Sequence, residues 1–293
     1  MIRALCLLVC LSPIAAAQDA AERLLAQANA AYASLRAGEA VGLYRDYLAH
    51  YRDRADVRVF LGGALLNLDQ LDAAFDEAHR ALALDGGYAK AYILAGRVCA
   101  ARRQWDRAQT FFAAAQRLDK RDPDAWYFSG RASYDANRFE QAVAAFEQAL
   151  RAGAEQSRVY ENLGLAQDAL GQFGAAGKSL RKAVDLAGAA WRPYLDYGAF
   201  LFRQGRPAES LRVLRQALAL GPAEVDIRFQ LARVLYDENG LEEASQVLEP
   251  ARPSNQCRVH NLMARIYSAR GETGSADLEI KALENCQAAP EWP

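Results

Sequence analysis

Two strings in this sequence contain residue types that bind phosphate or metal ions. The first, Gly177-Lys178-Ser179, resembles the end of a phosphate-binding loop, in which backbone amides and a lysine hold phosphate oxygens. Such a loop also needs glycine where Gln172 stands, and it needs a strand before it. The repeat described below instead places Lys178 inside a helix, so we predict no nucleotide site here.

The second string is an acidic cluster of Asp119, Asp122 and Asp124. A calcium site requires a cage of oxygen ligands and a glycine that turns the chain. Here the aspartates alternate with Lys120 and Arg121, which is typical of a solvated turn. We therefore predict no metal site and no cofactor.

Nucleophilic catalysis would need a serine or cysteine beside a histidine and an acid. The three histidines, His50, His79 and His260, are far apart in the chain, and no Cys-x-x-Cys or Cys/His metal spacing occurs. Because no catalytic set is assembled, we predict that the protein is not an enzyme.

The composition favours a packed, helical protein. Hydrophobic residues make up 52% of the 293 residues, which is far from the composition of a disordered chain. The formal net charge is −1, so the overall charge does not favour nucleic acid as a partner.

The first 17 residues have the pattern of a signal peptide. Arg3 precedes an apolar stretch, residues 4–11, and the small residues at 15–17 suit a signal peptidase that cleaves before Gln18. The apolar stretch is too short to span a bilayer. We expect a periplasmic or secreted protein with no membrane span after cleavage, although whether the signal is removed or retained is open.

The rest of the chain has a period of 34 residues. One series consists of the glycines Gly62, Gly96, Gly130, Gly164 and Gly198. A second, four residues earlier, consists of the aromatic residues Tyr92, Trp126, Tyr160 and Tyr194. Two further series consist of small residues: Ala40, Ala74, Ala108, Ala142, Ala176, Ser210 and Ala244, and Ala81, Ala115, Ala149, Ala183, Ala217 and Ala251.

This period predicts pairs of helices joined by tight turns. In each unit the aromatic residue and the glycine are four residues apart, which places them on one stripe of a first helix. The small residues recur seven apart on a second helix, where they let the two backbones approach. The expected turn residues are Asn137, Arg138, Gly171, Gly205, Asn239, Gly240 and Gly271. No unit can bury both faces alone, so neighbouring units must stack.

This pattern resembles the tetratricopeptide repeat, here of an exported bacterial type. The unit that begins at Ser157 matches the family pattern with Tyr160, Leu163, Gly164, Ala176, Leu180 and Ala183. The resemblance implies an all-α, right-handed solenoid of about eight tandem helix-turn-helix repeats in residues 18–286, followed by a tail, 287–293. The expected repeats lie near 21–54, 55–88, 89–122, 123–156, 157–190, 191–224, 225–256 and 257–286.

The resemblance also implies a ligand-binding surface. In this family one stripe of the first helices lines the concave face, at the second, fifth, ninth and twelfth positions of each unit. We call this set the first-helix stripe, and its candidate contacts are Arg97, Tyr127, Arg131, Tyr134, Asp168, Phe202, Phe229, Arg233, Tyr236 and Arg265. These residues would suit an extended peptide with acidic groups. Alternatively, the arginines are solvated or paired locally, since Arg131 precedes Asp135 and Arg233 precedes Asp237 by four residues.

We therefore expect a protein-interaction scaffold of the periplasm or cell envelope that binds a polypeptide. One alternative is a module that binds cell-wall glycan or exported polysaccharide, because Tyr127, Tyr134, Phe202 and Tyr236 could stack on sugar rings. Another is an accessory subunit of an envelope enzyme complex. The partner and the oligomeric state stay open at this point.

Two cysteines flank the last unit. Cys257 begins its first helix and Cys286 ends its second, and antiparallel helices bring such ends together. In an exported protein this arrangement predicts a disulfide across the last hairpin. Cys99 occupies an apolar position of a first helix, where we expect a buried thiol.

Overall fold

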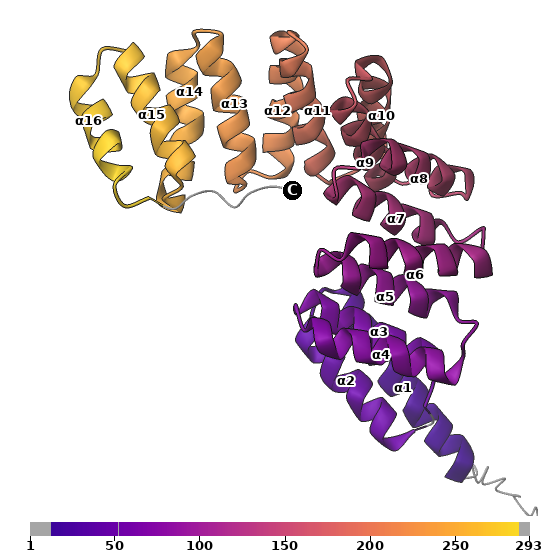
Figure 1. Cartoon of the computed structure of the whole chain (residues 1–293). Coiled ribbons are helices and arrows are strands. Elements are labelled where there is room, and N and C mark those ends of the chain that lie inside the picture. Colours follow the sequence, from indigo (N-terminus) through magenta and orange to yellow (C-terminus); the bar gives the residue numbers. More distant parts are fainter. Residues whose placement is uncertain (1–12, 52, 287–293) are drawn as a thin grey trace, which may run out of the picture. The chain divides into compact units, whose positions relative to one another are not determined.

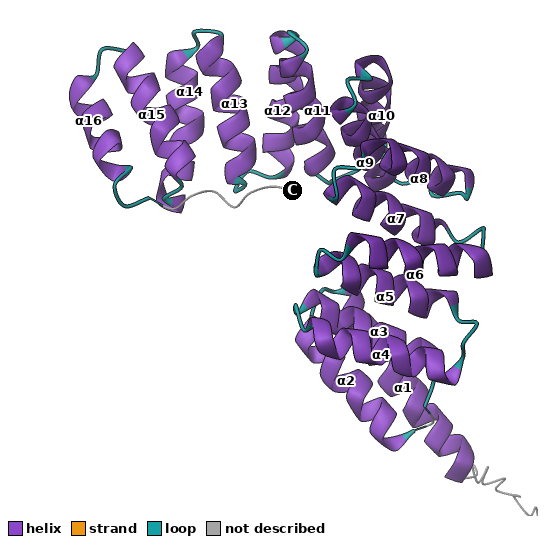
Figure 2. Cartoon of the chain, in the orientation of Figure 1, coloured by secondary structure: helices purple, strands orange, loops and turns teal. Residues whose placement is uncertain are grey.

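The computed structural model describes residues 13–51 and 53–286, with residues 13–17 as backbone alone (Figure 1). These residues form sixteen α-helices and one 3-10 helix, and they contain no strand (Figure 2). The all-helical architecture of tandem helix pairs predicted by the period is therefore confirmed. Most of the expected signal segment, residues 1–12, and the tail, 287–293, lie outside the described residues.

The chain divides into two compact units, which we describe separately as the N-terminal unit, up to Ala136, and the C-terminal unit, from Asn137 onward. The helices of the N-terminal unit are α1 (Pro13–Ala33), α2 (Ala37–His50), α3 (Ala55–Asn67), α4 (Leu71–Leu84), α5 (Ala89–Ala101), α6 (Trp105–Leu118) and α7 (Pro123–Asp135). Each helix packs on the next along the chain, and the first helices α3, α5 and α7 also contact one another in sequence.

The C-terminal unit repeats this arrangement. It contains α8 (Phe139–Arg151), α9 (Ser157–Ala169), α10 (Phe173–Asp185), α11 (Arg192–Arg203), α12 (Pro207–Leu220), α13 (Val225–Asp237), α14 (Leu241–Leu248), the 3-10 helix η1 (Glu249–Ser254), α15 (Cys257–Ala269) and α16 (Thr273–Ala282). Its first helices, α9, α11, α13 and α15, contact one another in order. One stripe of side chains therefore runs across successive first helices within this unit.

The periodic glycines allow the two helices of a repeat to pack closely. A Cβ on Gly96 of α5 would lie 2.5 Å from Cε1 of Phe112 on α6, which is too close for any side chain. Likewise, a Cβ on Gly164 would lie 2.7 Å from Cγ of Leu180. In these two repeats a large apolar side chain of the second helix thus occupies the space that the glycine leaves free, and Phe112 and Leu180 are fully buried.

The turn inside every repeat contains one residue with a left-handed backbone. Asn137, Gly171, Gly205, Asn239 and Gly271 adopt positive φ at this position. The equivalent residues of the first three repeats are Leu35, Asp69 and Arg103, with φ of 59°, 57° and 57°. These three residues adopt a left-handed backbone conformation, which costs an L-residue about 1–2 kcal/mol relative to the right-handed one.

The seventh repeat departs from the others at its end. Its second helix, α14, has only 8 residues and continues as η1, which contains Pro250 and Pro253. Asn255 then adopts a left-handed conformation with φ of 52° and leads into α15. The connection between α14 and the last helix pair, α15 and α16, is therefore irregular and rich in proline.

In the described part of the chain, no helix has both the length and the hydropathy that crossing a membrane requires.

Candidate functional site

The first-helix stripe of the N-terminal unit borders a cavity of about 240 Å³. Arg97 on α5 and Arg131 on α7 hold the same position in successive repeats, and both side chains line this cavity. Its other walls come from Leu66, Ala100, Ala101, Phe112, Phe128, Ala132 and Asp135. The cavity therefore combines two guanidinium groups with an apolar lining.

Arg97 is oriented by an aromatic ring and by no acid. Its guanidinium carbon lies 4.6 Å from the ring centroid of Phe128 on α7, which is a cation–π contact. Within the described residues, Arg97 has no carboxylate within ion-pair distance. Asp135, also in the cavity wall, is partly buried, and this burial raises its pKa while the charge of Arg131 opposes the rise.

The two tyrosines predicted for this part of the stripe lie in different environments. Tyr127 is buried, with only 5% of its surface exposed, and its ring contacts Phe128 at 5.1 Å between centroids. Tyr134 is half-buried. Tyr127 thus supports the ring that faces Arg97 and presents little surface of its own.

In the C-terminal unit, arginines of the stripe stack on rings of the preceding repeat. The guanidinium carbon of Arg233 on α13 lies 5.3 Å from the ring centroid of Phe202 on α11. That of Arg265 on α15 lies 4.7 Å from the ring of Tyr236 on α13. Both contacts join the ninth position of one repeat to the twelfth position of the repeat before it. The contact is therefore a repeated feature of this unit.

A third stacked arginine differs because an acid neutralises it. Arg258 lies over Phe229 at 5.0 Å and also forms an ion pair with Asp226. Arg233 and Arg265 have no such carboxylate partner within the described residues. Two of the three stacked guanidinium groups thus keep their charge available for a ligand.

Acidic residues on the stripe or directly beside it lie on α9 and α11. Asp168 is paired with Arg203, which the sequence analysis did not select. Burial raises the pKa of Asp196, and the hydrogen bond from Glu161 and the positive charge of Arg192 oppose the rise. Of the ten predicted residues, the structure therefore brings together Arg233 with Phe202 and Arg265 with Tyr236, and it places Asp168 in an internal ion pair.

Three residues that take part in these contacts were not predicted from the sequence: Phe128, Arg203 and Arg258. Two of them lie beside a predicted position, and the third was not selected as a contact. Phe128 directly follows the selected Tyr127, and Arg203 directly follows the selected Phe202. Arg258 stands at the second position of the last repeat, which belongs to the stripe. A search for any cation or ring one residue to either side of the stripe would have found all three.

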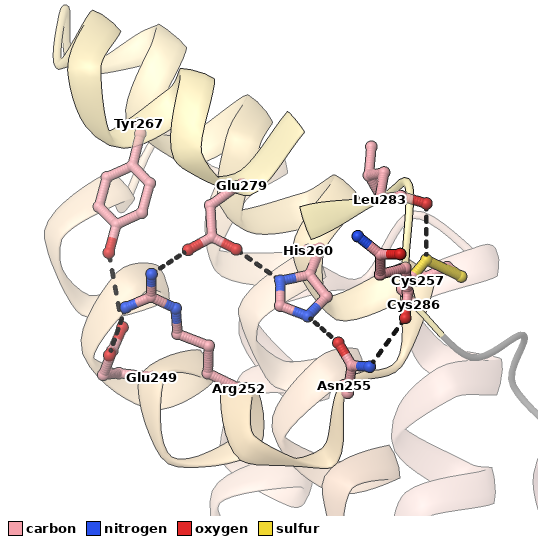
Figure 3. A network of polar contacts seen from close by, with 10 residues as sticks. Glu249, Arg252, Asn255, Cys257, His260, Tyr267, Glu279, Leu283 and Cys286 are labelled. Atoms are coloured by element: carbon pink, nitrogen blue, oxygen red, sulfur yellow. Dashed lines mark hydrogen bonds and ion pairs between the residues drawn. A yellow bond between two sulfur atoms is a disulfide. The ribbon is translucent and has the colours of Figure 1, made fainter. Parts of the chain in front are cut away.

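The last repeat contains a buried polar network that the sequence analysis also missed (Figure 3). Nδ1 of His260 lies 2.6 Å from Oε2 of Glu279, and both side chains are buried. The other carboxylate oxygen of Glu279 pairs with Arg252 of η1 at 2.7 Å. Asn255 contacts Nε2 of His260 and also donates its side-chain amide to the carbonyl of Asn285. The network therefore joins η1, α15 and the end of the hairpin.

The disulfide lies beside this network. Cys257 and Cys286, the pair expected from the sequence, are bonded, with 5.0 Å between their Cα atoms (Figure 3). Cys99 is the buried free thiol, and burial raises its pKa. The ring nitrogens of His260 contact the carboxylate of Glu279 and the amide of Asn255, so the geometry indicates a structural network.

The other residues considered for chemistry have structural roles. Lys178 lies inside α10, as the repeat predicted. Asp122 caps α7, because its Oδ1 accepts a hydrogen bond from the backbone N–H of Asp124 at 2.9 Å. Asp119 accepts a similar bond from the N–H of Arg121. Among the described residues, no group of histidine, cysteine, aspartate and glutamate side chains is placed to hold a metal ion.

Two segments of the chain match sequence profiles of the tetratricopeptide repeat, namely residues 129–190 and 201–266. The cellulose synthase 2 operon protein C of Komagataeibacter xylinus is 25% identical over 279 residues, which cover 86% of this chain and 19% of that protein. The anaphase-promoting complex subunit 3 of Schizosaccharomyces pombe is 26% identical over 165 residues, or 53% of this chain and 24% of that protein. The chain thus spans less than a quarter of either relative.

Solved structures with the same fold include several repeat proteins. A chain of the anaphase-promoting complex hetero-tetramer Cut9–Hcn1 superposes with a TM-score of 0.66 at 16% identity, covering 89% of this chain and 52% of that one. Pseudomonas aeruginosa pilF gives 0.60 at 20% identity, covering 72% and 92%. YrrB, described as a tetratricopeptide repeat protein with an unusual peptide-binding site, gives 0.50 at 21% identity, covering 70% and 97%. These identities support the shared fold alone.

Proposed function

Because the chain belongs to the tetratricopeptide repeat family, we propose that it is a non-enzymatic scaffold that binds a partner polypeptide along the first-helix stripe. One observation carries the proposal. Arg97, Arg233 and Arg265 each stack on an aromatic ring and have no carboxylate partner within the described residues. Arginines held by rings and aromatic side chains are the residues that contribute most to protein interfaces.

A polypeptide fits this surface better than a glycan does. Sugar rings stack on the open face of an aromatic side chain, but guanidinium groups already lie over Phe202 and Tyr236. Tyr127, another ring considered for stacking, is buried. We therefore favour polypeptide binding, and the same surface would serve an accessory subunit that binds an enzyme chain.

We further propose that the protein acts outside the cytoplasm. The charged start, apolar stretch and small residues of segment 1–17 support export. The disulfide between Cys257 and Cys286 also favours an oxidising compartment. Mass spectrometry of protein purified from its native cell tests this proposal. A mature chain that begins at Gln18 is expected, and a chain that retains Met1 in the cytoplasmic fraction would contradict it.

Photocrosslinking in the native cell tests the binding function. A photoreactive phenylalanine analogue replaces Phe202 or Tyr236 in the stripe, and in the matched control it replaces Phe173. Phe173 is 49% exposed but lies on the second helix α10, away from the stripe positions. We expect discrete protein adducts from the two stripe positions and far fewer from the control. Equal labelling at all three positions, or none at the stripe, would contradict the proposal.

A further inference from the structure

Two arginines of the C-terminal unit form equivalent contacts in successive repeats. Arg233 stacks on Phe202 and Arg265 stacks on Tyr236, with guanidinium-to-centroid distances of 5.3 and 4.7 Å. A cation–π contact supplies no acceptor oxygen for the guanidinium N–H groups, so it leaves the arginine able to bind a carboxylate. A guanidinium group held in this way is oriented before a ligand arrives, which reduces the entropy lost on binding.

The charges of these two groups are poorly compensated by the protein. Neither arginine has a carboxylate within ion-pair distance among the described residues. Nε of Arg233 is buried and has no hydrogen-bond acceptor in that part of the chain. This burial lowers the pKa of Arg233, an effect opposed by Asp237 and reinforced by Arg203. A carboxylate that approaches Arg233 would therefore meet a cation that has already lost part of its hydration.

We propose that Arg233 and Arg265 together bind two carboxylates about three residues apart in one acidic segment, which adopts the extended polyproline II conformation. The spacing follows from the packing of α13 on α15. Packed helices lie about 8–10 Å apart. A polyproline II segment advances about 3.1 Å per residue with about three residues per turn, so side chains three residues apart lie on the same face. This inference rests on the proposed function and names the chemistry of the partner.

The neighbouring charges limit the length of the acidic segment. Asp168, Asp196 and Glu161 lie on α9 and α11, the preceding first helices of the same unit. Because Asp168 already pairs with Arg203, that arginine is not left to bind further acids past Arg233, so the surface favours a short acidic segment. The net charge of the protein, −1, gives no overall attraction for nucleic acid or other long polyanions. A short acidic motif in a polypeptide is the ligand that satisfies both conditions.

A peptide array on the full-length, oxidised protein tests the inference. Each peptide is neutral except for two glutamates, which are placed at increasing separations, and each has a matched peptide with two glutamines. We expect the strongest binding at a separation of about three residues and a loss of about tenfold with glutamine. A maximum at about seven residues, the repeat of one helix face, would contradict the extended geometry. Equal binding of the glutamine peptides would contradict the acidic preference.

Variants then assign the effect to the two arginines. Arg233→Gln and Arg265→Gln should each weaken binding of the best glutamate peptide by about tenfold and leave the glutamine peptide unchanged. The matched control is Arg215→Gln, because Arg215 belongs to the same unit but lies on the second helix α12, outside the stripe, and pairs with Glu243. Circular dichroism confirms that each variant is folded.

The outcomes separate this inference from the proposed function. If the control variant weakens binding as much as the other two, or if neither Arg233→Gln nor Arg265→Gln has an effect, the inference is overturned. Crosslinks at Phe202 and Tyr236 would in that case still support polypeptide binding through the stripe. If those crosslinks are absent as well, both proposals fail.

Discussion

Arg265 on α15 stacks on Tyr236 of α13 with 4.7 Å between the guanidinium carbon and the ring centroid. The contact links two successive repeats at the surface, and the ring does not neutralise the charge it orients. We therefore expect the ring of Tyr236 to increase the affinity for a ligand, because it holds Arg265 in position.

Tyr236→Leu should weaken binding of an acidic peptide by about two- to fivefold, because a cation–π contact at an exposed site contributes about 0.5–1 kcal/mol. The matched control is Phe229→Leu, since Asp226 still holds Arg258 after the ring is removed. Fluorescence titration with a glutamate peptide measures both variants. An equal loss in the two variants would show that the rings act only on stability.

Gly96→Ala should destabilise the protein by about 1–3 kcal/mol, because the new Cβ would lie 2.5 Å from Cε1 of Phe112 in a packed interior. Gly174→Ala is the matched control: it is also a helical glycine, but nothing lies within 4 Å of its added Cβ. The control should be stabilised by up to about 1 kcal/mol. Thermal unfolding of both variants decides, and a tolerated Gly96→Ala would argue against the helix packing described above.

Removal of the disulfide should loosen the last hairpin. The bond closes a loop with a sequence separation of 29, and loss of such a crosslink costs about 2–4 kcal/mol. The Cys257→Ala/Cys286→Ala variant should therefore show faster amide exchange in α16, with little change in α9 and α10. Hydrogen exchange with mass spectrometry measures both regions, and unchanged protection in α16 would mean that the network around Glu279 holds the hairpin alone.

The stability of Asp196→Asn relative to the native protein should depend on pH. Burial is the main cause that raises the pKa of Asp196 in the folded protein. A raised carboxyl pKa destabilises the fold once the group ionises, so this cost is absent below its unfolded pKa and grows as pH rises through the folded pKa. Asp196→Asn removes the ionisation, and its advantage should be larger at about pH 7 than at about pH 4. Urea unfolding at the two pH values tests the sign, and a larger advantage at the lower pH would contradict it.

Much of the fold was predictable because the same short sequence pattern recurs in each repeat. The 34-residue spacing of Gly96, Gly130 and Gly164 indicates the helix pairs, and the structure shows the same spacing in the starts of α5, α7 and α9. Glycine and asparagine also predicted five of the turns. The turns at Leu35, Asp69 and Arg103 escaped prediction, because there the stacked helices impose a left-handed backbone on residues that do not favour it.

The positions of the candidate site residues were predictable from the sequence, but the contacts between them were not. The periodicity places Arg233 and Arg265 on one stripe, but it gives no information on which ring each guanidinium contacts. That depends on the offset between neighbouring first helices, which is a property of packing. The contact between His260 and Glu279 depends in addition on the irregular segment η1, whose path a repeat pattern does not describe.

The most direct test of the account observes the arginine side chains themselves. Nitrogen–proton spectra of the Nε–H groups of the full-length protein are recorded while a peptide with two glutamates about three residues apart is added. The account predicts saturable shifts for Arg233 and Arg265 at a common affinity, with Arg258 unchanged. Shifts confined to arginines outside the first-helix stripe, such as Arg215 on α12, would contradict the claim that this stripe binds the partner.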